Sequence, residues 1–484
     1  MKMEAPDKAK KTTEIPTDQV TPSELDTAAT GRLSARQIHI VDLSHNGRAV
    51  GKMAQGKVVF LDRGLPGETA LVSIYSRSRR YNRGKVLEIL SRSPAREKAP
   101  CQHFDICGGC SWQDLNYQAQ LRFKKKQVKD SLEKLGGFSG ALVAEPYPAD
   151  PTLFYRNKME FSFNRNERNS SGFNLGLHYR GEFSRVFDVK RCLLQSERTN
   201  DILAWVKKFV RDHKLEPYDV VKHTGFLRFL AIREGKRTGD LMLNFVTTFG
   251  QLPAADELVS GLIERFPEIT TIVHNQNDKR SNIAYGEAEV ILFGPGYIHE
   301  EILGRRFRVY ANSFLQTNSL QAETLYRLAI EQAQLEKSDR LFDLYCGAGT
   351  IGICAAERAA EVVGIESEQS ALIAADANAR ENDVSNITFF AGGVRETLRE
   401  KKAELGAADV VIIDPPRAGM HPRALHHAGT LQAKRIIYIS CNPATFSRDA
   451  AFFGKAGYQL HSVTPVDMFP HTAHIELVAT LDRS

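Results

Sequence analysis

The stretch FDLYCGAGTIG, residues 342–352, decides the fold of the C-terminal part of the chain. Its apolar start is typical of a buried strand, the glycines after it predict a tight turn, and residues 350–352 predict the start of a helix. Glycines in such a turn let the backbone pass close under a ligand, and a helix N-terminus favours anions or polar hydroxyls. Gly347, Gly349 and Gly352 also satisfy the dinucleotide-binding fingerprint, a spacing that is weak by itself.

Glu366 ends the next apolar run, at the separation from the glycines at which an acid binds ribose hydroxyls. An NAD-dependent oxidoreductase is therefore one interpretation of the turn. Two features favour another. Asp343 just before the glycines resembles S-adenosylmethionine (SAM) methyltransferases, and DPPR, residues 414–417, resembles the acid-Pro-Pro motif of nucleic-acid base methyltransferases. Proline makes such a loop a rigid acceptor, because it fixes the backbone and removes a competing donor.

Short apolar runs alternate with helical stretches after residue 307, at 341–345, 362–366, 387–390, 410–413 and 436–439. This alternation predicts a doubly wound parallel α/β sheet, in which ligands bind at the carboxyl ends of the strands. Cys441 follows the last run, and Asn442-Pro443 stops that strand. A thiol is the most nucleophilic common side chain at neutral pH. From the residues alone, a buried core thiol is an equally good interpretation.

Length and composition predict a soluble protein of about three domains, with 484 residues, 42% hydrophobic and 25% charged. We expect no membrane segment and a cytoplasmic location, because the N-terminus lacks the apolar core of a signal peptide. The net charge of +6 is small, so an anionic partner must meet local patches. Basic residues mixed with aromatics at 76–85 and 122–126 suit RNA phosphates and bases, or simply a solvated face.

The N-terminal part has a different texture. Residues 1–30 are polar and predict a disordered tail. Four short strands at 37–43, 57–61, 69–74 and 84–90, separated by turn residues, predict a small β-barrel over 31–93. A helix is expected over 117–135. The region up to residue 307 is rich in strands and predicts an α+β domain.

Four cysteines, Cys101, Cys107, Cys110 and Cys192, form a possible ligand set. A reducing compartment makes disulfides unlikely for them. From spacing alone, structural zinc and an iron–sulfur cluster both remain open.

Five motifs together resemble one family, the RNA uridine-5-methyltransferases that use SAM. They are FLQTN (314–318), the loop 343–349, DPPR (414–417), SCNP (440–443) and HIEL (474–477), in the family's order. The barrel resembles the TRAM domain that many members carry. One position departs: the family often has Gly-Asp after two residues equivalent to Phe389-Phe390, as a contact to the adenine side of SAM, whereas this chain has Ala391-Gly392-Gly393.

The resemblance implies a Rossmann-like SAM methyltransferase domain over 113–146 and 308–484, and a central domain over 94–112 and 147–307. It implies that Cys441 adds to C6 of a uridine, that Glu476 is the base, and that SAM or the active site is contacted by Gln316, Tyr345, Thr350, Glu366 and Asp414. Members with this cysteine arrangement carry a four-iron, four-sulfur cluster, which makes zinc the less favoured ligand.

The implied substrate is RNA with a uridine flipped out of a single-stranded loop, because the thiol and the methyl donor must reach both sides of the base. We expect ribosomal RNA rather than transfer RNA, and a monomer. A second alternative, from another functional class, is an RNA-binding assembly factor with an inactive methyltransferase fold.

Overall fold

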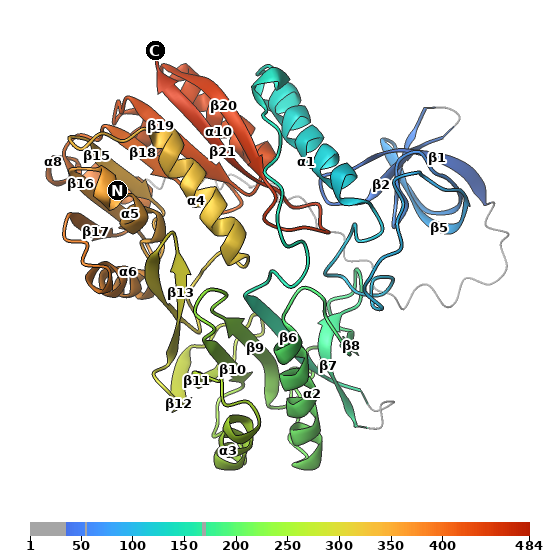
Figure 1. Cartoon of the computed structure of the whole chain (residues 1–484). Coiled ribbons are helices and arrows are strands. Elements are labelled where there is room, and N and C mark those ends of the chain that lie inside the picture. Colours follow the sequence, from blue (N-terminus) through green and yellow to red (C-terminus); the bar gives the residue numbers. More distant parts are fainter. Residues whose placement is uncertain (1–34, 54–55, 167–170) are drawn as a thin grey trace, which may run out of the picture.

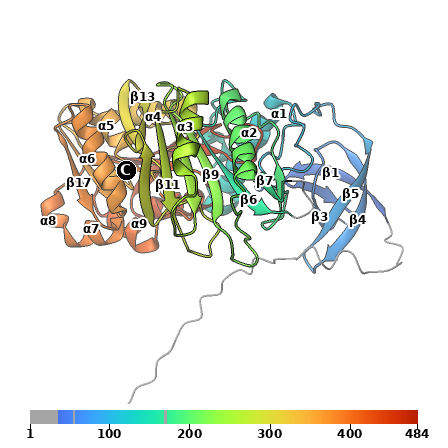
Figure 2. The same ribbon diagram turned by 90° about the horizontal axis from the view of Figure 1, so that it is seen from below.

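The computed structural model describes residues 35–53, 56–166 and 171–484, so the tail predicted for residues 1–30 lies outside the described residues. The described chain forms an N-terminal barrel, a central strand-rich part and a C-terminal α/β part (Figure 1). Seen from below, the C-terminal part, the central part and the barrel follow one another across the molecule (Figure 2). Within these ranges, no helix has the length and apolar character that a bilayer crossing requires.

The barrel closes in the order β1-β2-β3-β5-β4. Its strands are β1 Arg36–Leu43, β2 Ala49–Lys52, β3 Val58–Leu61, β4 Thr69–Arg77 and β5 Tyr81–Ser91. The apolar pattern predicts four of them and misses β2, whose sequence AVGK has no strand-like apolar run. Steric crowding favours glycine at position 51 of this strand, because a Cβ there would lie 2.3 Å from Cγ2 of Ile38, inside the barrel core.

The helix α1 (Tyr117–Ser131) connects the barrel to the C-terminal part. Asn116 caps it, accepting a hydrogen bond from the backbone N–H of Ala119. The helix continues into a π-helical turn, Leu132–Gly136, and a 3₁₀ turn follows at Gly140–Leu142. α1 lies beside α10 and β20 in Figure 1, and its Val128 belongs to the core of the C-terminal sheet. This agrees with the helix predicted over 117–135.

A fully buried ion pair fastens α1 to the segment before the last strand. The ammonium of Lys124 donates to Oδ1 of Asp467 at 2.5 Å and to the carbonyl of Phe469 at 3.0 Å. The hydroxyl of Tyr117 donates to the other carboxylate oxygen of Asp467 at 2.9 Å. Each buried charge is therefore compensated by its partner and by further hydrogen bonds, which is the condition for such a pair to persist.

The central part is a seven-stranded sheet in the order β12-β11-β10-β9-β6-β7-β8. The strands are β6 Lys158–Arg165, β7 Phe173–His178, β8 Val186–Asp188, β9 Leu227–Glu234, β10 Leu241–Thr247, β11 Thr271–Gln276 and β12 Ala288–Phe293. Helices α2 (Glu197–Asp212) and α3 (Ala255–Arg265) pack against it, and both contribute to its apolar core. A hairpin, β13 (Tyr297–Ile302) and β14 (Arg305–Tyr310), leads to the C-terminal part.

The C-terminal sheet has the order β17-β16-β15-β18-β19-β21-β20. Five parallel strands, β15 Arg340–Leu344, β16 Glu361–Glu366, β17 Ile387–Ala391, β18 Val410–Ile413 and β19 Arg435–Ser440, are followed by antiparallel β20 Tyr458–Val466 and β21 Glu476–Arg483. This confirms the predicted doubly wound α/β fold. The strand order reverses between β15 and β18, which is where such sheets bind ligands.

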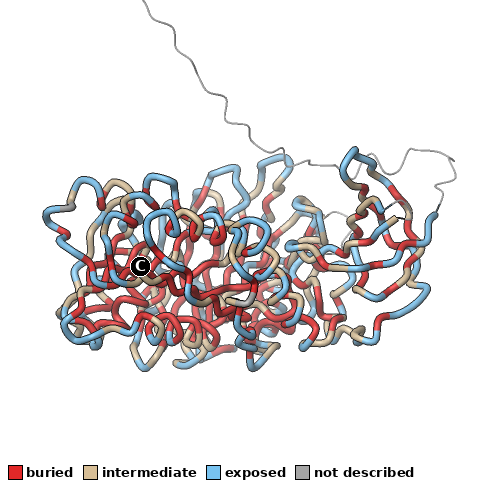
Figure 3. Tube along the Cα trace, turned by 90° about the horizontal axis from the view of Figure 1, so that it is seen from above, coloured by how far each residue is buried: buried red, intermediate tan, exposed pale blue. Residues whose placement is uncertain are grey.

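Helices cover both faces of this sheet. They are α4 Ser319–Ala333, α5 Thr350–Ala355, a 3₁₀ turn Ala356–Arg358, α6 Gln369–Glu381, α7 Val394–Glu400, α8 Lys402–Leu405, α9 Pro422–Gly429 and α10 Pro443–Lys455. Alternate residues of one strand enter different cores: Phe342 packs on the α10 side and Leu341 on the α4 side. The continuous apolar runs of the sequence arise because both faces are covered. Figure 3 shows buried residues through the interior of the molecule and exposed ones along the outer turns.

The buried Lys124–Asp467 pair generates a stability prediction. Lys124→Met leaves the Asp467 carboxylate buried without its cation and should destabilise the protein by about 3–5 kcal/mol. Lys126→Met, on the same helix but paired with Asp42 and Asp130 at the surface, should cost less than about 1 kcal/mol. Differential scanning calorimetry of both variants measures the difference in Tm, and equal Tm values for the two would contradict this account.

Candidate active site

The glycine turn after β15 leaves open space for a ligand. Tyr345, Gly347 and Gly349 all have positive φ values, 65°, 54° and 77°, before α5 begins at Thr350. A Cβ on Gly349 would lie 2.9 Å from the ring of Phe389, whereas a Cβ on Gly347 would meet no atom within 4 Å. The turn is thus closely packed beneath and open above, as the passage of a backbone under a cofactor requires.

Two carboxylates hold this turn in place. Buried Asp343 accepts a hydrogen bond from the N–H of Gly352 at 2.9 Å, and burial raises the pKa of its carboxyl to about 7. Glu366, at the end of β16, accepts from the N–H of Gly347 at 3.1 Å. Asp343 therefore supports the turn from inside, while half-buried Glu366 stands at its mouth, where ribose hydroxyls would be bound.

Tyr345 and Thr350 flank the same turn. Burial, with the negative charges of Asp449, Glu366 and Glu396 nearby, raises the pKa of the Tyr345 phenol to about 12. Thr350 is buried at the first position of α5. Both predicted contact residues are brought to the turn.

The strand β18 delivers Asp414 to the same edge of the sheet, and burial raises the pKa of this carboxyl to about 7. The loop after it is fastened to the start of α10. The carbonyl of Arg417 accepts hydrogen bonds from the side chains of Asn442 and Thr445, at 3.2 and 3.4 Å. The N–H of Met420 donates to the carboxylate of Asp449 at 2.9 Å.

Cys441 stands between β19 and α10, half-buried at the carboxyl edge of the sheet. Burial raises the pKa of its thiol to about 11; the charges of Glu476 and Asp414 also raise it, and the charge of Arg417 lowers it. All four groups are therefore close enough to interact electrostatically. Asn442 caps α10 by accepting from the N–H of Ala444 at 3.1 Å, which fixes the backbone next to the thiol.

Glu476 reaches this edge because β21 runs antiparallel to β19. Leu477 pairs with Ser440, so the first residue of β21 lies beside the last residues of β19. Glu476 is only 3% exposed, and burial raises the pKa of its carboxyl well above the ordinary value; Asp414 raises it further and Arg417 lowers it. The structure thus brings together the thiol of Cys441 and the protonatable carboxyl of Glu476, which are 35 residues apart in the sequence.

Gln316 lies in the loop between β14 and α4 and is buried. Its carbonyl accepts from the side chain of Asn157 at 2.8 Å, and the neighbouring Asn318 side chain donates to the carbonyl of Met468 at 3.1 Å. The loop that carries Gln316 is therefore tied both to the central part and to the segment that leads to Glu476.

Three residues of the site were not singled out by sequence reasoning. Arg417 supplies the positive charge near Cys441 and Glu476, and its place in the DPPR motif was the signal for it. Tyr326 of α4 is buried close to Asp414 and Glu476, and burial raises its pKa well above the ordinary value. Glu396 of α7 holds its carboxylate oxygen 2.5 Å from where a Cβ on Gly393 would lie. Nothing in the apolar pattern points to the last two.

The other two thiols of this part of the chain are buried, Cys346 in the glycine turn and Cys354 in the core. Burial, with Asp343 and Glu366 nearby, raises the pKa of Cys346 well above its usual value. The thiol of Cys354 in α5 contacts the carbonyl of Ile302 at 3.7 Å, inside an apolar cluster. Neither is a better nucleophile than Cys441.

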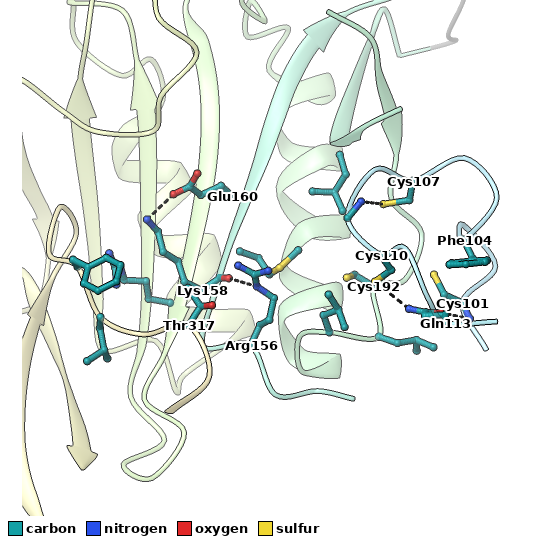
Figure 4. A pocket seen from close by; sticks show the side chains of 18 of the residues that line it. Cys101, Phe104, Cys107, Cys110, Gln113, Arg156, Lys158, Glu160, Cys192 and Thr317 are labelled. Atoms are coloured by element: carbon teal, nitrogen blue, oxygen red, sulfur yellow. Dashed lines mark hydrogen bonds and ion pairs between the residues drawn. The ribbon is translucent and has the colours of Figure 1, made fainter. Parts of the chain in front are cut away.

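The four predicted ligand cysteines lie apart from this edge and line one cavity of about 390 Å³, at one end of it in Figure 4. Burial is the main cause of the raised thiol pKa values, about 12 for Cys110 and about 11 for Cys192. The charges of the other cysteines raise both further. Backbone N–H groups of Gly109 and His103 donate to the sulfurs of Cys107 and Cys101, at 3.3 and 3.4 Å. Gln113 donates to the sulfur of Cys110 at 3.2 Å.

Comparisons with known proteins identify the family of the chain. Residues 264–484 match the tRNA (uracil-5-)-methyltransferase family, and residues 34–87 match the TRAM domain. An uncharacterized RNA methyltransferase of Chlorobaculum tepidum is 38% identical over 93% of this chain and 96% of its own length. One of Halalkalibacterium halodurans is 36% identical over 92% of this chain and 96% of its own length.

A solved structure shows the same architecture over nearly the whole chain. It is the Pyrococcus abyssi tRNA (uracil-54, C5)-methyltransferase in complex with S-adenosyl-L-homocysteine. It has a TM-score of 0.75 and 29% identity, and the match covers 92% of this chain and all of the solved one. The fold, the TRAM barrel and these relatives together show that the chain belongs to the tRNA (uracil-5-)-methyltransferase family of SAM-dependent RNA methyltransferases.

Proposed function

We propose that this enzyme transfers the methyl group of SAM to C5 of a specific uridine in RNA through a transient bond between Cys441 and C6 of the uracil. The observation that supports it best is the meeting of Cys441, Glu476, Asp414 and Arg417 at the carboxyl ends of β18 and β19, next to the glycine turn. The alternative of an NAD-dependent oxidoreductase does not account for a thiol paired with a protonatable carboxyl at this place.

The chemistry needs both groups. C5 of uracil is a poor nucleophile, so the thiolate of Cys441 first adds to C6 and turns the ring into an enolate. SAM, when bound, supplies the electrophilic methyl that C5 then takes. The Glu476 carboxylate removes the C5 proton, the C5–C6 double bond reforms, and the Cys441 sulfur leaves as thiolate.

Residues around the glycine turn fit the donor. Glu366 offers its carboxylate to ribose hydroxyls, and the open face above Gly347 admits the nucleoside. Glu396 is placed to supply the acidic contact that Gly393 lacks, since its carboxylate fills the space over that glycine. Gln316 and Asp414 remain proposed contacts to the donor or the base.

The target within RNA is proposed in two forms. We keep ribosomal RNA as the first substrate, on the combination of a TRAM barrel with the cysteine set. Transfer RNA is the second, because the 29% identical Pyrococcus abyssi enzyme is named for uridine 54 of tRNA. Mapping 5-methyluridine in ribosomal and transfer RNA from cells with and without the protein decides between them, and an unchanged pattern in both would support the inactive assembly factor instead.

We further propose that the four cysteines hold a four-iron, four-sulfur cluster. Four thiols around one cavity with N–H donors directed at three of the sulfurs fit cluster ligation, which depends on such hydrogen bonds. Within the described ranges, no three His, Cys, Asp or Glu side chains are gathered as ligands of a single metal ion, so the proposed ligand set rests on the shared cavity and on these hydrogen bonds.

The two catalytic assignments have different expected phenotypes. Cys441→Ala should lower methyl transfer about 10³-fold or more and form no covalent complex, because no other thiol reaches C6. Glu476→Gln should form the complex but release it slowly, so that protein bound to RNA accumulates on a denaturing gel. Cys354→Ala, in α5 and within the apolar core, is the matched control and should keep both steps. Substantial methylation by Cys441→Ala would show that the nucleophile is misassigned.

The raised pKa of Cys441 predicts the pH dependence of its alkylation. Only the thiolate reacts, and burial with two nearby carboxyls disfavours it, so the rate of iodoacetamide labelling should rise with pH towards a midpoint near 11. Arg417→Ala should move the midpoint up, since it removes the stabilising charge, and Glu476→Gln should move it down. Mass spectrometry of the Cys441 peptide measures these rates. A midpoint below pH 8 in the unmodified protein would contradict the electrostatics described above.

The proposed iron–sulfur cluster can be tested by the colour of the protein and by its iron and sulfide content. Protein purified without oxygen should be brown and contain about four iron and four sulfide per chain. Cys110→Ser should lose this iron, whereas Cys354→Ser, in the core of the C-terminal part, should retain it. Colourless protein with one zinc per chain would rule the cluster out.

A further inference from the structure

The cavity that holds the cysteines extends to a second end with a different character. In Figure 4 the cysteines lie at one end, Lys158 and Glu160 at the other, and Arg156 and Thr317 between them. Arg233 and Tyr285 also line the cavity. Neither end belongs to the edge of the sheet where Cys441 and Glu476 meet, so the second end has no role in the reaction described above.

This second end carries more positive charge than it can neutralise. Arg156, Lys158 and Arg233 face one carboxylate, Glu160, which pairs with Lys158. Arg233 is 3% exposed and donates to the carbonyls of Ala311 and Ser313. In the described part of the chain, the guanidinium groups of Arg156 and Arg233 have no carboxylate within ion-pair distance. The Nε of Arg233 has no acceptor there. A buried unpaired cation is costly unless an anion meets it.

The charges also act on one another. Burial, together with the positive charge of Arg233, lowers the pKa of Lys158, and burial lowers that of Arg233 to about 10. Thr317 adds a buried hydroxyl oxygen that has no partner among the described residues. The set therefore combines partly buried positive charge with a hydroxyl group that has no hydrogen-bond partner in the described ranges.

Aromatic rings stand at the rim of this site. Tyr285 is 42% exposed, and the ammonium of Lys158 lies 5.4 Å from its ring centre. Phe314 is 68% exposed, an unusual exposure for a phenylalanine. A cation and exposed rings at one site are what single-stranded nucleic acid needs, since phosphates take the charge and bases stack on the rings.

The site connects directly to the catalytic edge. One wall is the loop 313–317, which also carries Gln316, and the backbone N–H of Asn157 donates to the carbonyl of Thr317 at 2.8 Å. Burial lowers the pKa of His474, and the charges of Arg417, Lys124 and, least, Arg156 lower it further; His474 lies two residues before Glu476. The rim therefore shares the loop 313–317 with Gln316, a proposed contact to the donor or the base.

We propose that the end of the cavity away from the cysteines is a subsite for a second nucleotide of the RNA, close in sequence to the methylated uridine. Its base stacks on Tyr285 and Phe314, and its phosphate meets Lys158, Arg156 and Arg233. This subsite rests on the proposed RNA methylation, and it would set which sequence around the uridine is accepted.

The test is steady-state methylation of a short RNA that contains the mapped uridine. Tyr285→Ala should raise KM for this RNA about 5- to 100-fold, with little change in kcat or in KM for SAM. Lys158→Ala should raise it as well and reduce by about one the slope of log KM against log salt concentration. Lys208→Ala, an exposed lysine of α2 outside this cavity, removes the same charge and should stay within twofold of the unmodified protein.

A second arm identifies the nucleotide. Each base next to the uridine is replaced in turn by an abasic residue. At one position the loss should cost the unmodified enzyme about fivefold or more in KM and cost Tyr285→Ala nothing further. The subsite is refuted if Tyr285→Ala and Lys158→Ala match Lys208→Ala, or if every abasic loss is the same in both proteins. Absence of any methyl transfer by the unmodified enzyme would instead count against the proposed function.

Discussion

The antiparallel return of β21 along β19 is the constraint on which the site depends. It brings Glu476 to the edge where β19 ends and where Cys441 lies, two residues before α10 begins at Pro443. Because this edge is buried, the carboxyl of Glu476 holds its proton to higher pH and the thiol of Cys441 resists ionisation. The positive charge of Arg417 lowers the pKa of both groups. Arg417 lies in a loop that is hydrogen-bonded to the start of α10.

Contacts outside the sheet hold the segment that leads from β20 into β21. The segment between β20 and β21 is fixed to α1 through Lys124 and Asp467, and the carbonyl of its His471 accepts hydrogen bonds from the N–H groups of Ser111 and Trp112. Ser111 directly follows Cys110, the last of the three clustered cysteines. The indole N–H of Trp112 also donates to the carbonyl of Gly47 in the barrel, at 3.3 Å. Hydrogen bonds thus join the cysteine segment and the barrel to the segment that leads to Glu476. A cluster bound at the cysteines would stabilise these contacts without taking part in methyl transfer.

The sequence pattern predicted the five parallel strands of the C-terminal sheet to within a residue or two, because strands covered on both faces read as unbroken apolar runs; β18 is Val410–Ile413, as expected. It did not give the bounds of the antiparallel strands β20 and β21, on which the site depends. Motifs pointed to Cys441 and Glu476, whose roles remain proposals. The pattern also missed polar, long-range contacts. Lys124 and Asp467 are 343 residues apart, and Arg233 is one of three buried charged residues of β9, with Arg228 and Glu234. Charged residues in a strand read as solvent-facing positions in the sequence, so only the fold reveals their burial and their partners.

The most direct measurement uses RNA in which the target uridine carries fluorine at C5, where no proton is left for Glu476 to remove. The enzyme should then stall with RNA attached. After digestion with trypsin and nuclease, mass spectrometry should find the methylated nucleotide on the peptide of residues 436–448, at Cys441. Attachment at any other residue, or full turnover of this RNA with no attached peptide, would contradict the account.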